Sequence, residues 1–339
     1  MAILGGLLQR GDCVALVDFP NHKNSGDHLI FLGTLAYLKR MGIRVEYIAD
    51  ATRYNKSDLD GRLSERGPIL LQGGGNFGDR WPETQKFRER VIAENHDRRV
   101  IQLPQGIEFI TEQALSEAQS VYSAHPNLTI LIRDHVGVRE TTESFASTEV
   151  LFCPDLALGV GRLAGGVSDV DVVELMRRDS ESVRAYAKMS GYITRRGADW
   201  GLNARDELAW KVLHLPGALV RRVGFLRRPL YPLQRRTYLA IANLNVRSAQ
   251  RILSHGEIVI TDRLHGAVLA ALMGKPVVAM NNANGKVAAI FKDYLGTLPN
   301  VWFETGHSEA GACAEKLIGV DRIAGRRPES PEPSRPSYF

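Results

Sequence analysis

Short apolar segments that alternate with helical patterns constrain the fold of this 339-residue chain more than any other feature. In the first half, apolar runs expected to form strands occur at residues 14–18, 44–49, 67–72, 100–103, 128–133 and 150–153. The helices expected between them include one from about residue 27 to 41, which Gly42 ends, and one near residues 84–95. Strands that alternate with helices in this way indicate a parallel sheet covered by helices on both faces.

The same alternation resumes after a glycine-rich stretch at residues 163–168, which predicts a domain boundary. Expected strands then lie at residues 170–176, 257–261 and 276–280, and expected helices lie near residues 203–215, 237–254 and 286–295. We therefore expect two α/β domains, residues 1–162 and 169–320, whose loops face a shared cleft. Residues 321–339 are rich in proline and are expected to form a disordered tail.

Composition limits the class of protein and its compartment. A hydrophobic fraction of 44% and a charged fraction of 24% are typical of a soluble globular protein, and no apolar run is long enough to span a bilayer. The first residues lack the basic start of a secretory signal peptide. Cys13, Cys153 and Cys313 show no metal-ligand spacing, and their odd number argues against a disulfide framework. We expect a cytoplasmic protein without a metal site.

The segment between residues 260 and 286 carries the most chemistry. An apolar strand runs directly into the sequence DRLHG at residues 262–266, and an apolar helix follows. Ligands of open α/β sheets bind at the carboxyl ends of strands, and the start of a helix offers N–H groups to an anion. Arg263, His265 and, one βα unit later, Lys286 therefore predict a site for a small acidic ligand. A lone histidine is usually structural, but three such groups at one sheet edge are hard to explain by packing.

Asn24, Gly26 and Asp27 lie where the first strand is followed by its helix. Their N–H groups and polar side chains are suited to hold an oxygen atom of a ligand. The alternative is a simple helix cap, because Ser25 and Asp27 are residue types that commonly cap helices.

A glycine cluster, GGGNFGD at residues 73–79, follows a buried strand. Consecutive glycines let the backbone approach a ligand or another segment closely, and we interpret Gly74, Gly75 and Asn76 as substrate-binding residues. The spacing matches neither the dinucleotide fingerprint nor the Walker A pattern, so neither a dinucleotide nor ATP is expected. A tight turn without a ligand is the alternative.

Arg133 ends another apolar strand and is followed by Asp134. An arginine in this position is suited to bind a carboxylate or a phosphate through two parallel N–H groups. It is equally suited to a solvated ion pair with Asp134, which would contribute less than about 1 kcal/mol. Pro154 and Asp155 end the next strand, and Asp155 is expected to cap or orient a turn.

The positive charge is concentrated in one segment. The net charge is +5, yet no aspartate or glutamate occurs between Leu208 and Gly256, which enclose nine lysines and arginines. Residues 221–236 interleave six of the arginines with apolar residues such as Phe225. We interpret Arg221 to Arg236 as a site for an anionic membrane surface, where each basic residue contributes about 1 kcal/mol. This would seat the protein on the inner face of the cell membrane. A solvated basic loop is the alternative, and nucleic acid is not expected because no recognised motif accompanies the segment.

Several of these stretches together resemble the polysaccharide pyruvyl transferase family. They are NSGDHLI, QGGGNFGD, LPQGIEF, IRD and CPDLAL in the first half, and RRDSES, the Asp199-Trp200 pair, ITDRLHGAVLAALMGKPVV and NNANGK in the second. The resemblance extends from about Asn24 to Leu295. It implies two Rossmann-like domains facing a cleft, as in GT-B glycosyltransferases. It also implies transfer of the enolpyruvyl group of phosphoenolpyruvate to two hydroxyls of a sugar in exopolysaccharide synthesis, giving a cyclic pyruvate ketal and phosphate without a cofactor.

The resemblance also assigns residues to the site. Those that match the family's motifs are Arg133, Arg263 and His265 for catalysis, and Leu264, Asn282 and Lys286 for substrate binding. Two positions depart from the common family pattern. Asp262 stands where serine is frequent, and Ala283-Asn284 stand where serine and tyrosine are frequent.

The expected chemistry agrees with these residue types. Phosphoenolpyruvate carries a carboxylate and a phosphate, which two arginines, a helix N-terminus and Lys286 are suited to bind. Its methylene carbon must be protonated before a hydroxyl can add. An imidazolium titrates near neutral pH, so His265 is suited to donate this proton. Asp27 or Asp79 is a candidate to accept the proton of the sugar hydroxyl. The acceptor is expected to be a glycan, carried on a lipid.

Two alternative functions remain open from the sequence. The first is a GT-B glycosyltransferase that uses a nucleotide sugar, although the acidic residue that usually binds the ribose is not evident. The second is a non-catalytic relative that only binds a glycan or a membrane.

Overall fold

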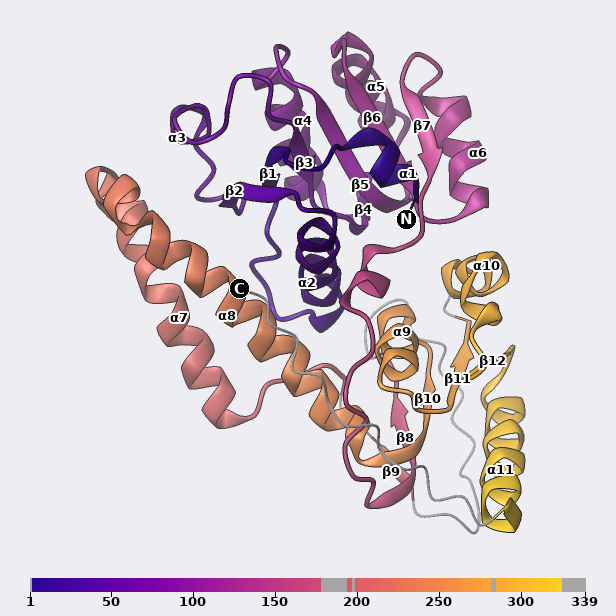
Figure 1. Ribbon diagram of the computed structural model, residues 1–339. Coiled ribbons are helices and arrows are strands. Elements are labelled where there is room, and N and C mark those ends of the chain that lie inside the picture. Colours follow the sequence, from indigo (N-terminus) through magenta and orange to yellow (C-terminus); the bar gives the residue numbers. More distant parts are fainter. Residues whose placement is uncertain (1, 178–193, 197–198, 282–284, 325–339) are drawn as a thin grey trace. The chain divides into compact units, whose positions relative to one another are not determined.

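A computed structural model describes residues 2–177, 194–196, 199–281 and 285–324 (Figure 1). The chain divides into two compact units, each with its own sheet. Unit 1 consists of Met1–His22, Ile30–Gly159 and Glu207–Asn243, and unit 2 consists of the described residues of Lys23–Leu29, Val160–Asp206 and Leu244–Phe339. The division falls inside the helices α2 (Ser25–Arg40) and α8 (Arg227–Ser254). Each unit is therefore built from segments that lie far apart in the sequence.

The sheet of unit 1 is entirely parallel, with the strand order β2-β1-β3-β5-β6-β7, and the short strand β4 also pairs with β5. The strands are β1 (Cys13–Val17), β2 (Arg44–Ala49), β3 (Ile69–Leu71), β4 (Gly74–Phe77), β5 (Val100–Ile107), β6 (Leu128–Ile132) and β7 (Glu149–Phe152). Most of their residues are buried on both faces, which explains why they appear in the sequence as short apolar runs rather than as alternating patterns.

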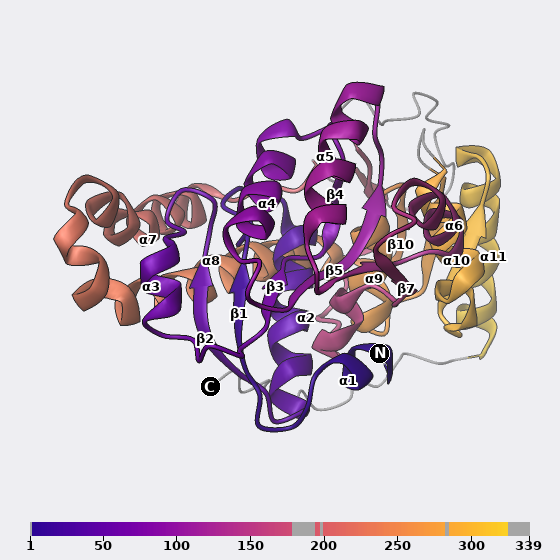
Figure 2. The same cartoon turned by 90° about the horizontal axis from the view of Figure 1, so that it is seen from above.

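Helices cover both faces of this sheet. In β1, Ala15 and Val17 point into the core that α4 and α5 complete, whereas Val14 and Leu16 point to the opposite face. Figure 2 shows α4 and α5 on one side of the strands and α2 on the other. The remaining helices of the unit are α1 (Ala2–Leu7), α3 (Lys56–Asp60), α4 (Pro82–Glu94), α5 (Glu112–Ala124), α6 (His135–Ser144) and α7 (Ala204–Arg222), with the 3-10 turns η1 (Leu156–Val160) and η2 (Gly224–Leu226).

The sheet of unit 2 is also parallel, with the strand order β12-β11-β10-β8-β9. Apolar side chains of β8, β10 and β11 pack against α11 to form the core of the unit. The strands are β8 (Val170–Leu175), β9 (Thr194–Arg196), β10 (Gly256–Thr261), β11 (Val277–Met280) and β12 (Val301–Glu304). The helices are α9 (Leu264–Leu272), α10 (Lys286–Asp293) and α11 (His307–Ala324), with the 3-10 turn η3 (Leu295–Thr297).

The predicted α/β class is confirmed, and each of the predicted strands lies in a parallel sheet. Two alternatives that the sequence left open are wrong. Part of the glycine cluster is not a tight turn but the strand β4, because its backbone pairs with the extended end of β5. The arginine-rich segment is not a basic loop but the end of α7 and the beginning of α8. Residues 321–324 of the predicted disordered tail belong instead to a helix, α11 (His307–Ala324). Residues 325–339 and Asn282 lie outside the described residues.

Candidate active site

The turn from β10 to α9 places Arg263 at the start of a helix. The hydroxyl of Thr261 donates a hydrogen bond to the carbonyl oxygen of Leu175 (2.6 Å) and accepts one from the N–H of Arg263 (3.1 Å). Arg263 occupies the N-cap position of α9 in an extended conformation, and its own side chain forms no capping hydrogen bond. The positive end of the α9 dipole therefore lies at the carboxyl edge of the sheet, which favours an anion there.

The guanidinium of Arg263 is held by two neighbouring side chains. Its Nη2 forms an ion pair with the carboxylate of Asp199, and its central carbon lies 5.9 Å from the centre of the Trp200 ring. The N–H of Trp200 donates to Asp199 Oδ1 at 2.6 Å, which fixes the orientation of that carboxylate. The residues Asp199 and Trp200 form part of the family resemblance, but no sequence pattern predicts that they contact Arg263.

Asp262 has a structural role beside this turn. It is buried, and its Oδ1 accepts the N–H of Arg177 at 2.8 Å, which ties the end of β10 to the residues after β8. Burial raises the pKa of the Asp262 carboxyl, although the Arg177 N–H and the charges of Arg263 and Arg177 act in the opposite direction. Asp262 stands where serine is frequent in the family, so an ionisable hydrogen-bonding side chain replaces a neutral one at this position.

His265 lies in the first turn of α9 and contacts Gly26, which belongs to the same unit. A Cβ atom at position 26 would come within 2.6 Å of His265 Nδ1 and 2.9 Å of its Cβ and Cγ. Only glycine leaves room for the imidazole, so the turn at the start of α2 does more than cap a helix. The structure therefore brings together two of the predicted site residues that are separated by more than 200 positions in the sequence.

Polar side chains order the turn that contains Gly26. Asn24 Oδ1 accepts the N–H of Gly26 at 3.1 Å, and Asn24 Nδ2 donates to Asp27 Oδ2 at 2.8 Å. The hydroxyl of Ser25 donates to the carbonyl oxygen of Asn245 at 3.1 Å. These bonds hold Gly26 against His265, so Asn24 and Asp27 support the position of the imidazole.

Arg133, in unit 1, follows β6 and is almost fully buried. Its Nη1 donates to Asp155 Oδ2 at 2.9 Å, and this carboxylate is also buried. The solvated pair of Arg133 with Asp134 is therefore not formed. Asp134 instead caps α6 by accepting the N–H of Gly137 at 2.7 Å.

The other edge of the Arg133 guanidinium faces glycine backbone. A Cβ atom would lie 3.4 Å from Nη2 at Gly75 and 3.3 Å from Nη2 at Gly106. Within the described part of the chain, Arg133 Nε has no hydrogen-bond partner. The predicted substrate-binding residue Gly75 and the predicted catalytic Arg133 therefore lie side by side, and the buried guanidinium packs against glycine backbone.

A second buried arginine, which the sequence analysis did not single out, holds the glycine cluster in place. Arg88 of α4 pairs with Asp18, with Nε 2.8 Å from Oδ2, and donates to the carbonyl oxygens of Asn76 (3.1 Å) and Gln72 (3.2 Å). The N–H of Asn76 donates to Gln105 Oε1 at 3.3 Å. The backbone N–H and carbonyl groups of Asn76 are thus both hydrogen-bonded to other residues of unit 1. Asp18, a non-glycine residue, adopts a φ of 70°, a strained conformation that often marks a functional site.

Asp79 is held by hydrogen bonds to the segment before α5. Its carboxylate accepts the N–H of Ile110 (2.6 Å), the N–H of Thr111 (3.0 Å) and the hydroxyl of Thr111 (2.8 Å). Desolvation would raise the pKa of Asp79, but these hydrogen bonds outweigh it and lower the pKa. A carboxylate with a lowered pKa is a weak base, which leaves Asp27 as the remaining candidate among the two.

The three remaining predicted site residues that the structure describes lie at the starts of helices or strands. Leu264 is the first residue of α9 and is buried, so it packs in the core of unit 2. Lys286 is the first residue of α10, directly after Gly285, whose φ of 71° requires the left-handed region. Gly74, the remaining predicted glycine, opens β4 next to Gly75.

Comparison with known proteins shows the family of this chain. The family model for polysaccharide pyruvyl transferases matches residues 24–284. The chain belongs to the polysaccharide pyruvyl transferase family. This transferase is 29% identical over 297 residues to Pyruvyl transferase 1 of Schizosaccharomyces pombe, a match that covers 83% of this chain and 69% of that protein. It is 27% identical over 292 residues to EpsO of Bacillus subtilis, with 85% of this chain and 87% of that protein covered.

A solved structure also resembles the transferase. The crystal structure of a functionally uncharacterised protein of Klebsiella pneumoniae matches with a TM-score of 0.55 and 17% identity, covering 90% of this chain and 96% of that chain. At this level of identity the likeness concerns the fold alone. The family match covers both predicted arginines and His265, since residues 133, 263 and 265 lie within it.

Proposed function

We propose that this transferase moves the enolpyruvyl group of phosphoenolpyruvate onto two hydroxyls of a glycan, forming a cyclic pyruvate ketal and releasing phosphate. The observation that carries this proposal is the start of α9, where Arg263, oriented by Asp199 and Trp200, stands at the N-terminus of the helix. A fixed guanidinium and a helix N-terminus together suit a phosphate or a carboxylate better than a neutral group.

His265 supplies the acid for the first step of this proposal. It projects from the first turn of the same helix and is held against Gly26. Protonation of the methylene carbon leaves a cation at the adjacent carbon, and a sugar hydroxyl then forms a C–O bond there and loses its proton. A second hydroxyl of the sugar displaces the phosphate in the same way. One ketal and one phosphate result, and no electrons are gained or lost. Arg263 stabilises the charge of the departing phosphate.

Arg133 is proposed to act in the same reaction from unit 1. The edge of its guanidinium that does not contact Asp155 faces the backbone of Gly75 and Gly106, and its Nε has no hydrogen-bond partner within the described residues. Whether Arg133 and Arg263 act on one donor is testable by a double-variant cycle. Donor affinity lost in the double variant should differ from the sum of the two single losses by about 0.5 kcal/mol or more if the same anion contacts both.

The acceptor is proposed to be a sugar of a polysaccharide precursor carried on a lipid. The direct test supplies phosphoenolpyruvate labelled in its carbon chain, together with a lipid extract from the producing cell, and follows the label into the glycan. We expect incorporation with the wild type and none with the His265→Asn variant.

The alternative functions are outcomes of the same experiment. If label enters only from a nucleotide sugar, the protein is a glycosyltransferase and the proposal is wrong. If neither donor is consumed, a protein that only binds a glycan or a membrane is favoured. A glycan extract without its lipid carrier shows whether the lipid is required.

A further inference from the structure

The helix α7 carries a row of exposed apolar side chains that the transfer reaction does not explain. Leu208, Val212, Leu215 and Leu219 are 64%, 53%, 62% and 45% exposed, and their spacing of four, three and four residues places them on one face of the helix. The opposite side of α7 faces unit 1, since a Cβ atom at Gly217 would lie 2.2 Å from Nε of Arg53. Four large apolar side chains in one exposed row are unusual for a surface that meets only water.

The turn that follows α7 extends this apolar surface. Phe225, in the 3-10 turn η2 between α7 and α8, is 82% exposed, and Leu233 on α8 is 45% exposed. Figures 1 and 2 both show α7 and the first part of α8 as adjacent helices joined at this turn. We call the exposed apolar residues of this hairpin, 208, 212, 215, 219, 225 and 233, the apolar surface of the hairpin.

From Leu208 onward, the hairpin carries exposed basic residues and no acidic ones. Lys211, Arg221, Arg222 and Arg236 are exposed, and no aspartate or glutamate occurs between Leu208 and Gly256. Two other arginines of the hairpin differ from these residues because they form ion pairs. Nε of Arg227 and of Arg228 lie 3.6 and 3.3 Å from the carboxylate of Asp58 in unit 1.

We propose that the α7–α8 hairpin seats the protein on the surface of an anionic phospholipid bilayer. The apolar surface would enter the boundary between headgroups and acyl chains, while the four exposed cations contact lipid phosphates. None of the described helices has the length and the apolar character needed to cross a bilayer, so the hairpin lies on the membrane. This inference concerns where the protein works and does not depend on which group it transfers.

A second copy of the chain fits the same surface less well. An antiparallel pair of α7 helices that matches Leu208 with Leu219 and Val212 with Leu215 also matches Arg205 with Arg222 and Asp206 with Arg221 of the second copy. A parallel pair sets each basic residue against itself. The hairpin carries an excess of positive charge in either arrangement, which opposes self-association, whereas an anionic surface attracts this charge.

The test is co-sedimentation of the full-length protein with vesicles of phosphatidylcholine alone and of phosphatidylcholine with phosphatidylglycerol. We expect binding only to the anionic vesicles, and weaker binding as salt is added. The triple variant Arg221→Gln, Arg222→Gln, Arg236→Gln should weaken the partition constant about a hundredfold, because each cation contributes about 1 kcal/mol near an anionic surface. Phe225→Asn should weaken it about tenfold through lost burial of one aromatic ring.

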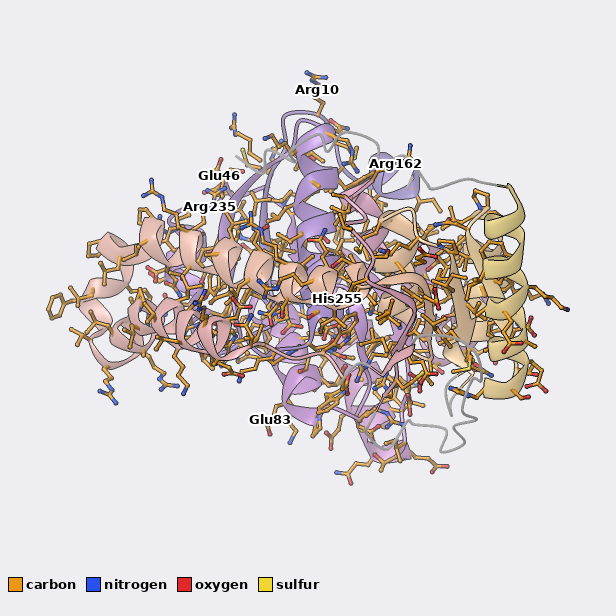
Figure 3. All side chains as sticks on the ribbon, turned by 90° about the horizontal axis from the view of Figure 1, so that it is seen from below. Arg10, Glu46, Glu83, Arg162, Arg235 and His255 are labelled. Atoms are coloured by element: carbon orange, nitrogen blue, oxygen red, sulfur yellow. The ribbon has the colours of Figure 1, made fainter. Side chains whose placement is uncertain are left out.

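Matched variants act as controls. Arg10→Gln, Arg139→Gln, Arg162→Gln removes the same charge from exposed positions elsewhere, of which Arg10 and Arg162 project from the surface in Figure 3. Ile110→Asn removes a 66% exposed apolar side chain outside the hairpin. Neither control should change vesicle binding by more than about twofold.

Three results would overturn the proposal. One is wild-type protein that ignores anionic vesicles, and another is equal loss of binding in the two arginine triples, which would indicate only general attraction. The third is a dimer, measured by light scattering, that Leu215→Asn dissociates while vesicles are not bound. Turnover of labelled phosphoenolpyruvate is measured separately, so a failure of the membrane proposal is distinguishable from a failure of the transfer reaction.

Discussion

The two sheet-edge arginines, Arg133 in unit 1 and Arg263 in unit 2, follow parallel strands in the same way but are held differently. Arg133 is bonded to a buried carboxylate, and the helix that follows it is capped by Asp134. Arg263 is bonded to Asp199, whose side chain is 27% exposed, and the helix that follows has no side-chain cap. The first arrangement is more costly to disturb, and the second is more available to a ligand. The same strand-arginine-helix sequence is thus buried and capped in one unit and partly solvated in the other.

The largest expected effect is the loss of turnover when His265 is replaced. His265 lies in the first turn of α9, and His135 lies at the corresponding position of α6, so the two histidines compare the two helix starts directly. His265→Asn should lower the rate of phosphate release about a thousandfold, since a positioned acid typically contributes a factor of a hundred to ten thousand. Phosphate release with saturating acceptor measures this effect. His135→Asn, at the start of α6, is the matched control. A similar loss in both variants would mean that the two turns do not differ in chemistry.

Removing each arginine should separate stability from donor binding. Arg133→Ala should destabilise unit 1 by about 3–5 kcal/mol, because Asp155 would remain as an unpaired buried charge. Replacing both Arg133 and Asp155 by alanine should recover much of this loss.

Arg263→Ala should cost less than about 1–2 kcal/mol of stability, since Asp199 is partly solvated, and should mainly weaken phosphoenolpyruvate binding. Chemical denaturation and calorimetric titration measure the two quantities. Equal destabilisation by the two single variants would contradict the comparison.

A smaller effect is expected at Gly26, whose contact defines the position of His265. Gly26→Ala should lower the turnover number by about tenfold, because the added methyl group overlaps the imidazole and overpacking costs about 1–3 kcal/mol. Gly6→Ala is a suitable control, since a Cβ atom there meets no neighbour within 4 Å. If Gly26→Ala retains full turnover, the contact with His265 is not required for catalysis.

The smallest effect concerns the pH dependence of stability at the α9 turn. Burial raises the pKa of Asp262 in the folded state, so the stabilisation that this carboxyl provides when protonated is present below the ordinary aspartate pKa of about 4. It is lost as the pH rises through the higher folded pKa. Asp262→Asn keeps an oxygen for the Arg177 N–H and removes the charge. Melting temperatures measured from pH 3 to 8 should therefore converge at low pH and favour the variant at neutral pH. An unchanged difference across this range would contradict the prediction.

Local patterns were sufficient to predict most elements of the fold. The apolar runs at residues 14–18 and 257–261 indicated β1 and β10, and Gly42 indicated the end of α2. These features depend on neighbouring residues, whose propensities act over a few positions. The candidate residues Arg133, Arg263 and His265 could also be selected, because strand ends in a parallel sheet gather at one edge.

Contacts between distant segments could not be predicted in this way. No local pattern indicates that Asp155 pairs with Arg133, that Asp199 holds Arg263, or that Gly26 accommodates His265. No local pattern predicted helices in the arginine-rich segment, where Tyr231 of α8 packs in the core of unit 1 and stabilises the helix.

The sequence by itself determined the two parallel sheets, the strand ends that carry arginine, and the family. The tertiary structure alone decided which carboxylate meets each guanidinium, which glycine admits the imidazole, and which arginines of the hairpin are exposed. The physical reason is the range of the forces involved. Backbone propensity and apolar periodicity act between near neighbours in the chain, while ion pairs and steric fit act between atoms that only folding brings together.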